Sequence, residues 1–101
     1  MKKALILAAT AMLMTPLAAM AERDGATVYN TKCMACHMTG AAGAPIVGKA
    51  DQWAPRIEKG IDGLLATAKS GINAMPPMGT CMDCTDGELK AAIQHMMDNS
   101  K

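Results

Sequence analysis

Phenylalanine is absent from the sequence, and only one tryptophan and one tyrosine are present, although half of the residues are apolar. A core with so few aromatic rings is thin, and a domain this short commonly needs a disulfide, a metal or a cofactor to stay folded. Charge is nearly balanced, and no basic cluster alternates with aromatic residues, so composition gives no sign of a nucleic-acid surface. We therefore expect a small domain whose core is completed by a bound group.

The sequence also lacks an apolar run long enough to cross a bilayer as a helix. The longest run, Ala4 to Met14, has 11 residues, whereas a spanning helix needs about 18–20. It follows a basic start, Met1-Lys2-Lys3, and precedes the A-x-A site Ala19-Met20-Ala21, a pattern typical of a secretory signal peptide. We expect residues 1–21 to be removed on export and residues 22–101 to form one domain with 8 basic and 9 acidic residues.

The motif that organises the chain is Cys33-Met34-Ala35-Cys36-His37. On a helix, the two thiols and the imidazole project from one side of a single turn. Two cysteines at this spacing can each bond to one vinyl group of a haem while the following histidine binds its iron. A C-x-x-C pair alone also suits half a zinc site or a redox dithiol, but a redox pair does not need the adjoining histidine. We interpret the motif as the covalent attachment site of one c-type haem.

A haem iron with His37 on one face needs a ligand on the other face, and a methionine thioether raises the reduction potential and excludes oxygen. The full sequence has 11 methionines. Met75 precedes Pro76-Pro77, whose fixed backbone angles would hold it extended, so it is the favoured ligand, and Met78 remains the alternative. Four others lie too near His37 or on a helix stripe: Met34, Met38, Met96 and Met97.

Two further residues are candidates for supporting the site. Pro45 follows a loop of small residues, and its carbonyl could accept a hydrogen bond from the outer ring nitrogen of His37, unless it is only a turn proline. The indole of Trp53 could donate to a haem propionate, or could simply pack in the core. Arg56 and Lys49 could screen the same propionate, but we expect them to lie in solvent.

The helical pattern predicts an all-α fold. We expect a helix from near Asp24 into the motif, short helices over Asp51–Gly60 and Asp62–Lys69, and a last helix that begins with the capping box Thr85-Asp86-Gly87-Glu88. The apolar stripe of the last helix should pack against Gly25, Val28 and Tyr29, with Gly25 allowing close approach, and His95 should face solvent. That stripe comprises Leu89, Ala92, Ile93, Met96 and Met97.

A second C-x-x-C, formed by Cys81 and Cys84, is followed by Thr85 and not by histidine, so it does not predict a second haem. In an exported protein these thiols are expected to form a disulfide that closes the turn before the last helix. A catalytic dithiol is one alternative. A four-cysteine zinc site is another, although the gap of 44 residues between the pairs far exceeds the usual ~15–20.

With these segments in place, the chain resembles the class I cytochromes c, and specifically the bacterial cytochrome c5 family. The resemblance implies thioethers at Cys33 and Cys36, axial ligation by His37 and Met75, a Cys81–Cys84 disulfide and a His37–Pro45 bond. It also implies a small class I cytochrome c fold, in which crossing terminal helices, short helices and loops wrap one haem. The matching segments are Cys33-Met34-Ala35-Cys36-His37, Gly43-Ala44-Pro45, Trp53-Ala54-Pro55-Arg56-Ile57, Gly71, Ala74-Met75-Pro76-Pro77, Gly79-Thr80-Cys81 and Cys84.

The function implied by the resemblance is electron transfer by a periplasmic carrier of a bacterial respiratory chain, and not an enzyme activity. Its partners would be an electron donor and an electron acceptor, membrane-bound respiratory complexes among them, with no nucleic acid and no small-molecule substrate. Two alternatives stay open. One is a haem ligand-binding or peroxidase-like protein with an open sixth position, and the other is a thiol-disulfide module that uses Cys81 and Cys84.

Overall fold

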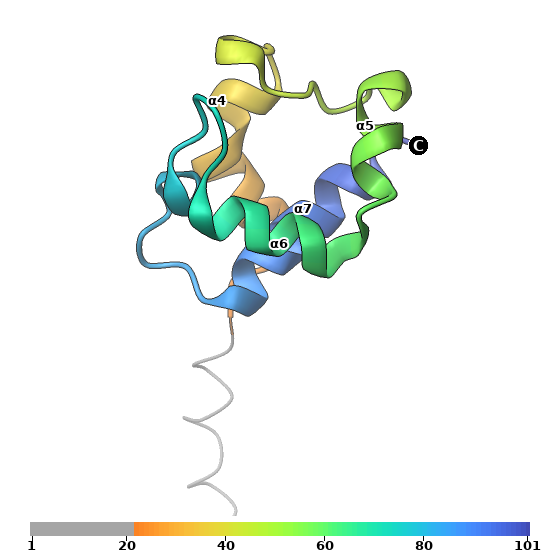
Figure 1. The fold of residues 1–101 in the computed structure, drawn as a ribbon. Helices are drawn as coiled ribbons and strands as arrows, with labels where there is room; N and C mark the ends of the chain where they lie inside the picture. Colours follow the sequence, from red (N-terminus) through yellow and green to blue (C-terminus); the bar gives the residue numbers. More distant parts are fainter. Residues whose placement is uncertain (1–21) are drawn as a thin grey trace, which may run out of the picture.

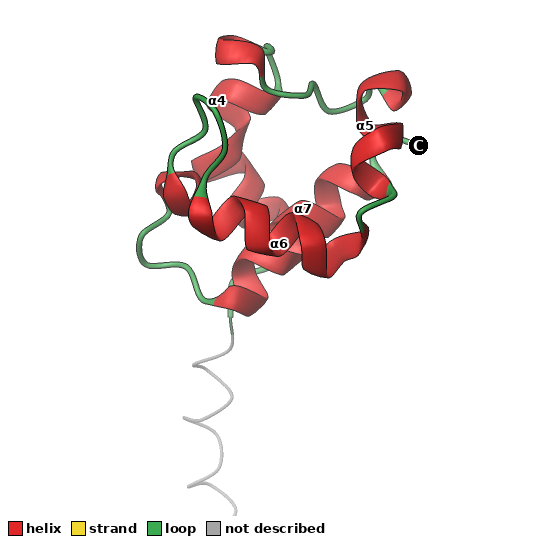
Figure 2. Cartoon of the chain, in the orientation of Figure 1, coloured by secondary structure: helices red, strands yellow, loops and turns green. Residues whose placement is uncertain are grey.

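A computed structural model of the chain describes residues 22–101; the predicted signal peptide, residues 1–21, lies outside the described residues. Helical segments form the described part, and no strand occurs in it apart from one isolated bridge (Figures 1 and 2), so the all-α prediction is confirmed. No helix within 22–101 has the length and apolarity to span a membrane. The elements are α3 (Gly25–Val28), η1 (Tyr29–Cys33), α4 (Met34–His37), η2 (Ala41–Gly43), α5 (Ala50–Ile57), α6 (Gly60–Ser70), η3 (Pro77–Thr80) and α7 (Asp86–Asp98).

The first three elements form one rod that carries the C-x-x-C-H motif. Its predicted start is confirmed, because the Asp24 carboxylate caps α3 and accepts a hydrogen bond from the backbone N–H of Thr27 at 2.8 Å. The π-helical segment η1 between α3 and α4 was not predicted. Such segments are rare and often lie at functional sites. Here η1 joins the packing face of α3 to the motif in α4.

Close crossing of α3 and α7 brings the two ends of the domain together (Figure 1). A Cβ atom on Gly25 would overlap the carbonyl of Ala91, so only glycine permits this approach. Val28 and Tyr29 are buried against the stripe of α7, as predicted. The expectation that His95 faces solvent is wrong: it is half-buried, with its ring 5.3 Å from that of Tyr29, because the large tyrosine ring reaches the flank of α7.

The middle helices differ from the prediction at their ends. Helix α5 begins at Ala50, after an extended Lys49, and ends at Ile57, three residues before the predicted terminator Gly60. Gly60 instead begins α6 with a φ of +75°, and so turns the chain between the two helices. Gly71 ends α6 as predicted. The capping box of α7 is also confirmed, since both reciprocal hydrogen bonds between Thr85 and Glu88 are present.

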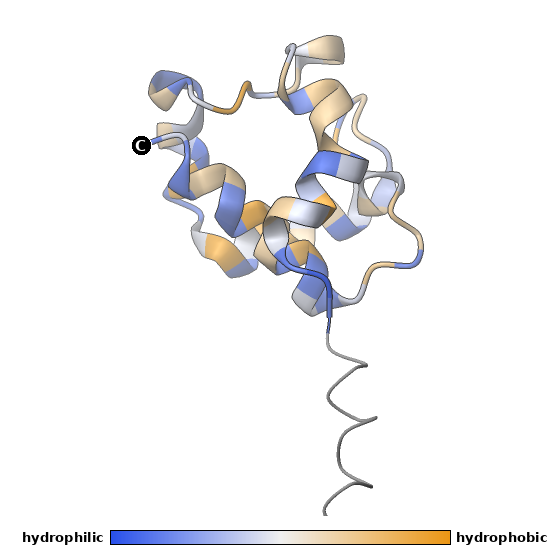
Figure 3. Ribbon diagram, turned by 180° about the vertical axis from the view of Figure 1, so that it is seen from behind, coloured by the Kyte–Doolittle hydropathy of each residue, from blue (hydrophilic) through white to orange (hydrophobic). Residues whose placement is uncertain are grey.

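Two small apolar clusters form the core and leave a central space bordered by residues of every helical element except α3. Hydrophilic and hydrophobic residues are interspersed along the helices (Figure 3). One cluster surrounds Tyr29 and Trp53, and the other surrounds the Cys81–Cys84 disulfide. The clusters therefore sit at the sides of the space and do not fill it.

Candidate haem-binding site

The space between the clusters is a cavity of about 530 Å³. This volume lies within the ~300–1,000 Å³ range of small-molecule and cofactor sites. Most lining residues are apolar, and they come from α4, α5, α6, α7 and the loops that precede α5 and η3. All six predicted site residues line it: Cys33, Cys36, His37, Pro45, Trp53 and Met75.

His37 is buried at the wall of this cavity, with 8% of its surface exposed. Its Nδ1 lies 2.9 Å from the carbonyl oxygen of Pro45. Because a carbonyl can only accept a hydrogen bond, Nδ1 is the donor, and in the neutral tautomer that carries its proton there Nε2 has the free lone pair. This is the arrangement of a histidine prepared to bind a metal through Nε2.

The segment that contains Pro45 is itself held in place by a set of hydrogen bonds. The N–H of Val47 donates to the carbonyl of His37 at 2.8 Å, and the N–H of Ile46 donates to Oε1 of Gln52 at 2.8 Å. These bonds tie the loop to both α4 and α5. The orientation of the imidazole is therefore set by the backbone of a well-anchored loop.

The contacts of Trp53 bear on the two roles that the sequence leaves open. Trp53 is buried, and its indole Nε1–H donates to the carbonyl of Ile46 at 3.0 Å, so the donor expected to reach a haem propionate is already used within the fold. The alternative of core packing is the one that the structure supports, because Trp53 belongs to the buried cluster. Its ring centroid lies 6.0 Å from that of His37. Trp53 thus supports the loop that orients His37.

The two motif cysteines carry free thiols on the same wall. Cys33 is half-buried and Cys36 is exposed. Burial raises the pKa of the Cys33 thiol, and the neighbouring Cys36 adds to the rise. The raised pKa disfavours the thiolate form of Cys33.

Met75 reaches the cavity from the loop between α6 and η3. Two backbone hydrogen bonds join it to Ile72: the Met75 N–H donates to the Ile72 carbonyl at 2.8 Å, and the Ile72 N–H donates back at 3.1 Å. Gly71 lies directly behind this turn, because a Cβ atom there would come within 2.8 Å of the Met75 carbonyl oxygen and 2.9 Å of the Pro77 nitrogen. The alternative ligand, Met78, also lines the cavity and packs against the disulfide cluster.

Charge is unevenly distributed around the cavity, although the charge of the whole sequence is nearly balanced. Lys32, Arg56 and Lys59 are among the lining residues, and no Asp or Glu of the described chain is. Arg56 is half-buried and donates to the carbonyl of Gln52 at 2.6 Å, so the expectation that it lies free in solvent is wrong; Lys49 is exposed, as expected. The cavity therefore has a positive rim in a nearly neutral domain.

Comparisons with known proteins identify the family. A family model described as cytochrome c oxidase, cbb3-type, subunit III matches residues 20–96. The cytochrome c5 of Azotobacter vinelandii is 54% identical over 76 residues, covering 73% of this chain and 92% of the relative, and that of Ectopseudomonas mendocina is 56% identical over 76 residues, covering 73% and 87%. The chain belongs to the cytochrome c5 family.

Solved structures agree with this assignment. A chain in the crystal structure of an electron-transfer complex of nitrite reductase with cytochrome c matches with a TM-score of 0.74 and 40% identity, covering 76% of this chain and 94% of that one. A mono-haem ferrocytochrome c from Shewanella putrefaciens matches with a TM-score of 0.69 and 46% identity, covering 80% and 99%. The fold is thus that of a small class I cytochrome c, and the cofactor of this family is one covalently attached haem c.

The donor set of the cavity fits this cofactor. Two free thiols, an imidazole with an available Nε2 and three methionine thioethers, those of Met75, Met78 and Met96, line a largely apolar space. Thiols, imidazole and thioether are the groups by which proteins attach and ligate haem c. A large apolar macrocycle in this space would also supply the core that the aromatic-poor sequence lacks.

Several structural residues were not found from the sequence. Cys81 and Cys84 form the predicted disulfide, but its contact with the Arg23 guanidinium was not foreseen. Arg23 also pairs with the buried Glu88, which the sequence assigned only to the capping box. Ser100 is buried at the C-terminus and accepts a hydrogen bond from the Gly48 N–H at 2.9 Å. No local pattern signals these contacts, because each joins residues far apart in the chain.

Proposed function

We propose that this cytochrome c5 family member is a periplasmic electron carrier whose haem is tethered by Cys33 and Cys36 and whose iron is bound by His37 and Met75. Bound haem c supplies an iron that can gain and lose an electron. The observation that carries the ligand assignment is the His37–Pro45 hydrogen bond, because it leaves Nε2 of His37 available in the cavity that Met75 also lines.

The protein's own residues would set the properties of the carrier. His37 is fixed by its bond to Pro45, which strengthens its basicity, and Met75 provides a thioether that raises the reduction potential. Both would stay in place during electron transfer and so leave no position for a substrate. The chain is therefore proposed to be an electron carrier and not an enzyme.

Substitution of the proposed sixth ligand tests this proposal. In Met75→Ala, the weak long-wavelength absorption band of a methionine–iron bond in the oxidised protein should disappear and the reduction potential should fall. Met78→Ala is the matched control, because it also removes a half-buried thioether from the cavity wall. The band should survive in Met78→Ala. Its loss there, with retention in Met75→Ala, would transfer the ligand role to Met78.

Carbon monoxide distinguishes the carrier from the haem ligand-binding or peroxidase-like alternative. Reduced parent protein with both axial positions occupied should not bind carbon monoxide, whereas reduced Met75→Ala should bind it. Ready binding by the parent would mean an open sixth position and would replace the carrier with the alternative. The thiol-disulfide alternative is disfavoured, because Cys81 and Cys84 are buried and joined in the described structure.

The proposed location and partners rest on separate observations. The signal-peptide pattern of residues 1–21 supports export to the periplasm, and a mature protein whose mass begins at Glu22 would establish it. The positive rim formed by Lys32, Arg56 and Lys59 supports docking of acidic redox proteins of a respiratory chain at the cavity mouth. Higher ionic strength should then slow electron exchange with such a partner. The nitrite reductase complex of a similar cytochrome supports redox proteins as the class of partner.

A further inference from the structure

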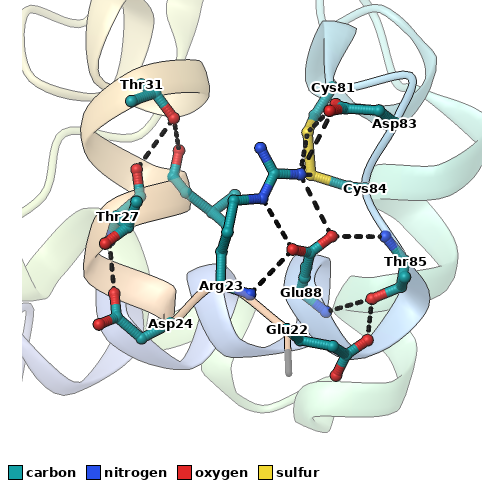
Figure 4. Close-up of polar contacts among 11 residues, drawn as sticks. Glu22, Arg23, Asp24, Thr27, Thr31, Cys81, Asp83, Cys84, Thr85 and Glu88 are labelled. Atoms are coloured by element: carbon teal, nitrogen blue, oxygen red, sulfur yellow. Dashed lines mark hydrogen bonds and ion pairs between the residues drawn. A yellow bond between two sulfur atoms is a disulfide. The ribbon is translucent and has the colours of Figure 1, made fainter. Parts of the chain in front are cut away.

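An ionic cluster around the buried Glu88 joins the start of the domain to α7. Glu88, at the first turn of α7, is 6% exposed, and it is paired with Arg23 by three hydrogen bonds. Arg23 Nε and Nη2 lie 2.7 and 3.2 Å from the two carboxylate oxygens, and the Arg23 backbone N–H donates to Oε2 at 3.0 Å. The Thr85 N–H donates to the same carboxylate at 2.9 Å (Figure 4). The guanidinium is thereby held in one orientation, as expected of a bidentate pair.

The same guanidinium lies against the disulfide. Arg23 Nη2 is 3.8 Å from Sγ of Cys81 and 3.6 Å from Sγ of Cys84, and it is also 3.6 Å from Oδ1 of Asp83 (Figure 4). Both cysteines are buried in the core cluster that includes Leu89. Arg23 therefore covers the disulfide from the solvent side while Glu88 fixes the position of Arg23.

The segment that leads into this disulfide needs an external restraint. Met78, Gly79 and Thr80 have φ values of +63°, +56° and +67°, so three consecutive residues occupy the left-handed region. Only glycine adopts that region without a steric penalty, and a β-branched residue such as Thr80 is least suited to it. Such backbone persists only when its surroundings determine it. The chain is fixed on one side by Pro76-Pro77 and on the other by Cys81, whose N–H donates to the Met78 carbonyl at 3.0 Å.

From these contacts we propose that Arg23 is a positioning residue for the loop of residues 75–80: by holding the Cys81–Cys84 disulfide against Glu88, it keeps the loop in the conformation that presents Met75 to the cavity. This inference rests on the proposed function, in which Met75 binds the iron. It assigns a role at the ligand to a side chain on the far side of the disulfide. The competing explanation is that Arg23 only fastens the N-terminal segment to α7.

Amide hydrogen exchange in the haem-loaded protein separates the two explanations. In Arg23→Gln, exchange of the Gly79 and Cys81 amides should accelerate about 10-fold, the scale of a lost charge-assisted hydrogen bond. The Val47 amide, on the His37 side, should keep its parent rate. The long-wavelength band should weaken in parallel. Equal acceleration at Val47 and Cys81 would mean a global loss of stability and would overturn the proposal, as would no acceleration at either.

A matched control removes another cation from the same end of α7. Lys69 Nζ lies 2.9 Å from the carboxylate of Asp86, at the first residue of α7, without contact to the disulfide. Lys69→Gln should therefore leave the exchange of Gly79 and Cys81 unchanged. Acceleration in Lys69→Gln equal to that in Arg23→Gln would overturn the proposal, because any charge lost at this helix end would then suffice.

A conservative variant covers the case in which Arg23→Gln does not fold. Arg23→Lys keeps a cation beside Glu88 but lacks the second donor that reaches the sulfur atoms. The positioning role is supported if, in Arg23→Lys, only the Gly79 and Cys81 amides exchange faster, and by more than in Lys69→Gln. Exchange of these amides at the parent rates would overturn it. Failure of the proposed function is visible separately, because a parent protein without the methionine–iron band would reject Met75 as ligand whatever the exchange rates show.

Discussion

His37 and Met75 line the same cavity, but the chain holds them by different means. His37 lies on a helix, and its ring is oriented by the Pro45 carbonyl of a loop that three further hydrogen bonds anchor. Met75 lies on a loop followed by left-handed residues, which a disulfide and an ionic cluster restrain from outside. The ring of His37 is oriented mainly by short-range hydrogen bonds, whereas the restraint on the loop after Met75 includes the Arg23–Glu88 pair, whose members are 65 residues apart. We therefore expect the Met75 side to yield first under any perturbation.

The largest effect is expected from a methyl group added behind Met75. Gly71→Ala places a Cβ atom against the Met75 carbonyl and the Pro77 nitrogen, at a φ of +82°. With a ψ of 160°, Gly71 occupies a region essentially restricted to glycine, which costs another residue about 1–3 kcal/mol, and the overlap adds about 1–3 kcal/mol. Denaturant unfolding should show both costs, and the methionine–iron band should weaken.

The His37 side offers a control at a glycine with a similar φ. Gly43 has a φ of +85°, and nothing lies within 4 Å of the position that its Cβ would occupy. Gly43→Ala should therefore show only the conformational cost of about 1–2 kcal/mol, with the band intact. Equal losses of stability in both alanine variants would contradict the idea that close packing behind Met75 holds its loop.

A smaller loss of stability, on the His37 side of the cavity, is expected from Trp53→Phe. This change keeps an aromatic ring beside His37 but removes the donor to the Ile46 carbonyl, at a cost of about 1–3 kcal/mol for an unpaired polar group. Exchange of the Val47 amide should accelerate more than exchange of the Met75 amide. Tyr29→Phe removes a polar atom from the other buried aromatic residue and should leave the Val47 amide unchanged. If Trp53→Phe accelerated exchange of the Met75 amide but not of the Val47 amide, the assignment of Trp53 to the His37 side would be wrong.

Much of the His37 side could be predicted from sequence, because its signals are local. The C-x-x-C-H spacing placed three groups on one turn, and the carbonyl of Pro45 was a candidate partner for a ring only eight residues away. The crossing of α3 and α7 was also predictable, because Gly25 and the apolar stripe of α7 indicate it. Met75 was selected by its neighbours Pro76-Pro77, and its ligand role stays a prediction.

What supports Met75 could not be predicted in the same way. Arg23 and Glu88 are 65 residues apart. Arg23 precedes α3 and Glu88 lies within α7, so no helical periodicity relates the two residues. The left-handed conformation of Met78 and Thr80 runs against the preference of both residues, so sequence would exclude it. The role of Trp53 stayed open between a haem propionate and the core, because the Ile46 carbonyl that accepts its indole N–H comes within reach only in the folded chain. The positive rim likewise collects residues from two separate segments, one with Lys32 and one with Arg56 and Lys59.

The last and smallest effect is expected on acidification. It is absent at neutral pH, but it acts selectively on one side of the cavity. The pKa of Glu88 is lowered from 4.5 to about 2, first by its hydrogen bond with the Arg23 side chain and then by backbone N–H donors of Thr85 and Arg23. Because the folded pKa is depressed, Glu88 contributes stability that is complete above about pH 4.5 and is lost as the pH falls toward 2. The Met75 loop should therefore loosen in that range.

Amide exchange across this pH window would show on which side acid acts. After correction for the intrinsic pH dependence of exchange, the Cys81 amide should lose protection earlier than the Val47 amide, because the lining of the cavity contains no carboxylate in the described chain. Glu88→Gln should remove most of the difference, since its amide does not titrate. Asp24 also has a lowered pKa, through its bond to the Thr27 N–H, and accounts for acid sensitivity that remains at the start of α3. The contrary outcome is that the Val47 and Cys81 amides lose protection together, both in the parent and in Glu88→Gln. Acid would then destabilise the whole domain, and the His37 and Met75 sides would not differ in their sensitivity to pH.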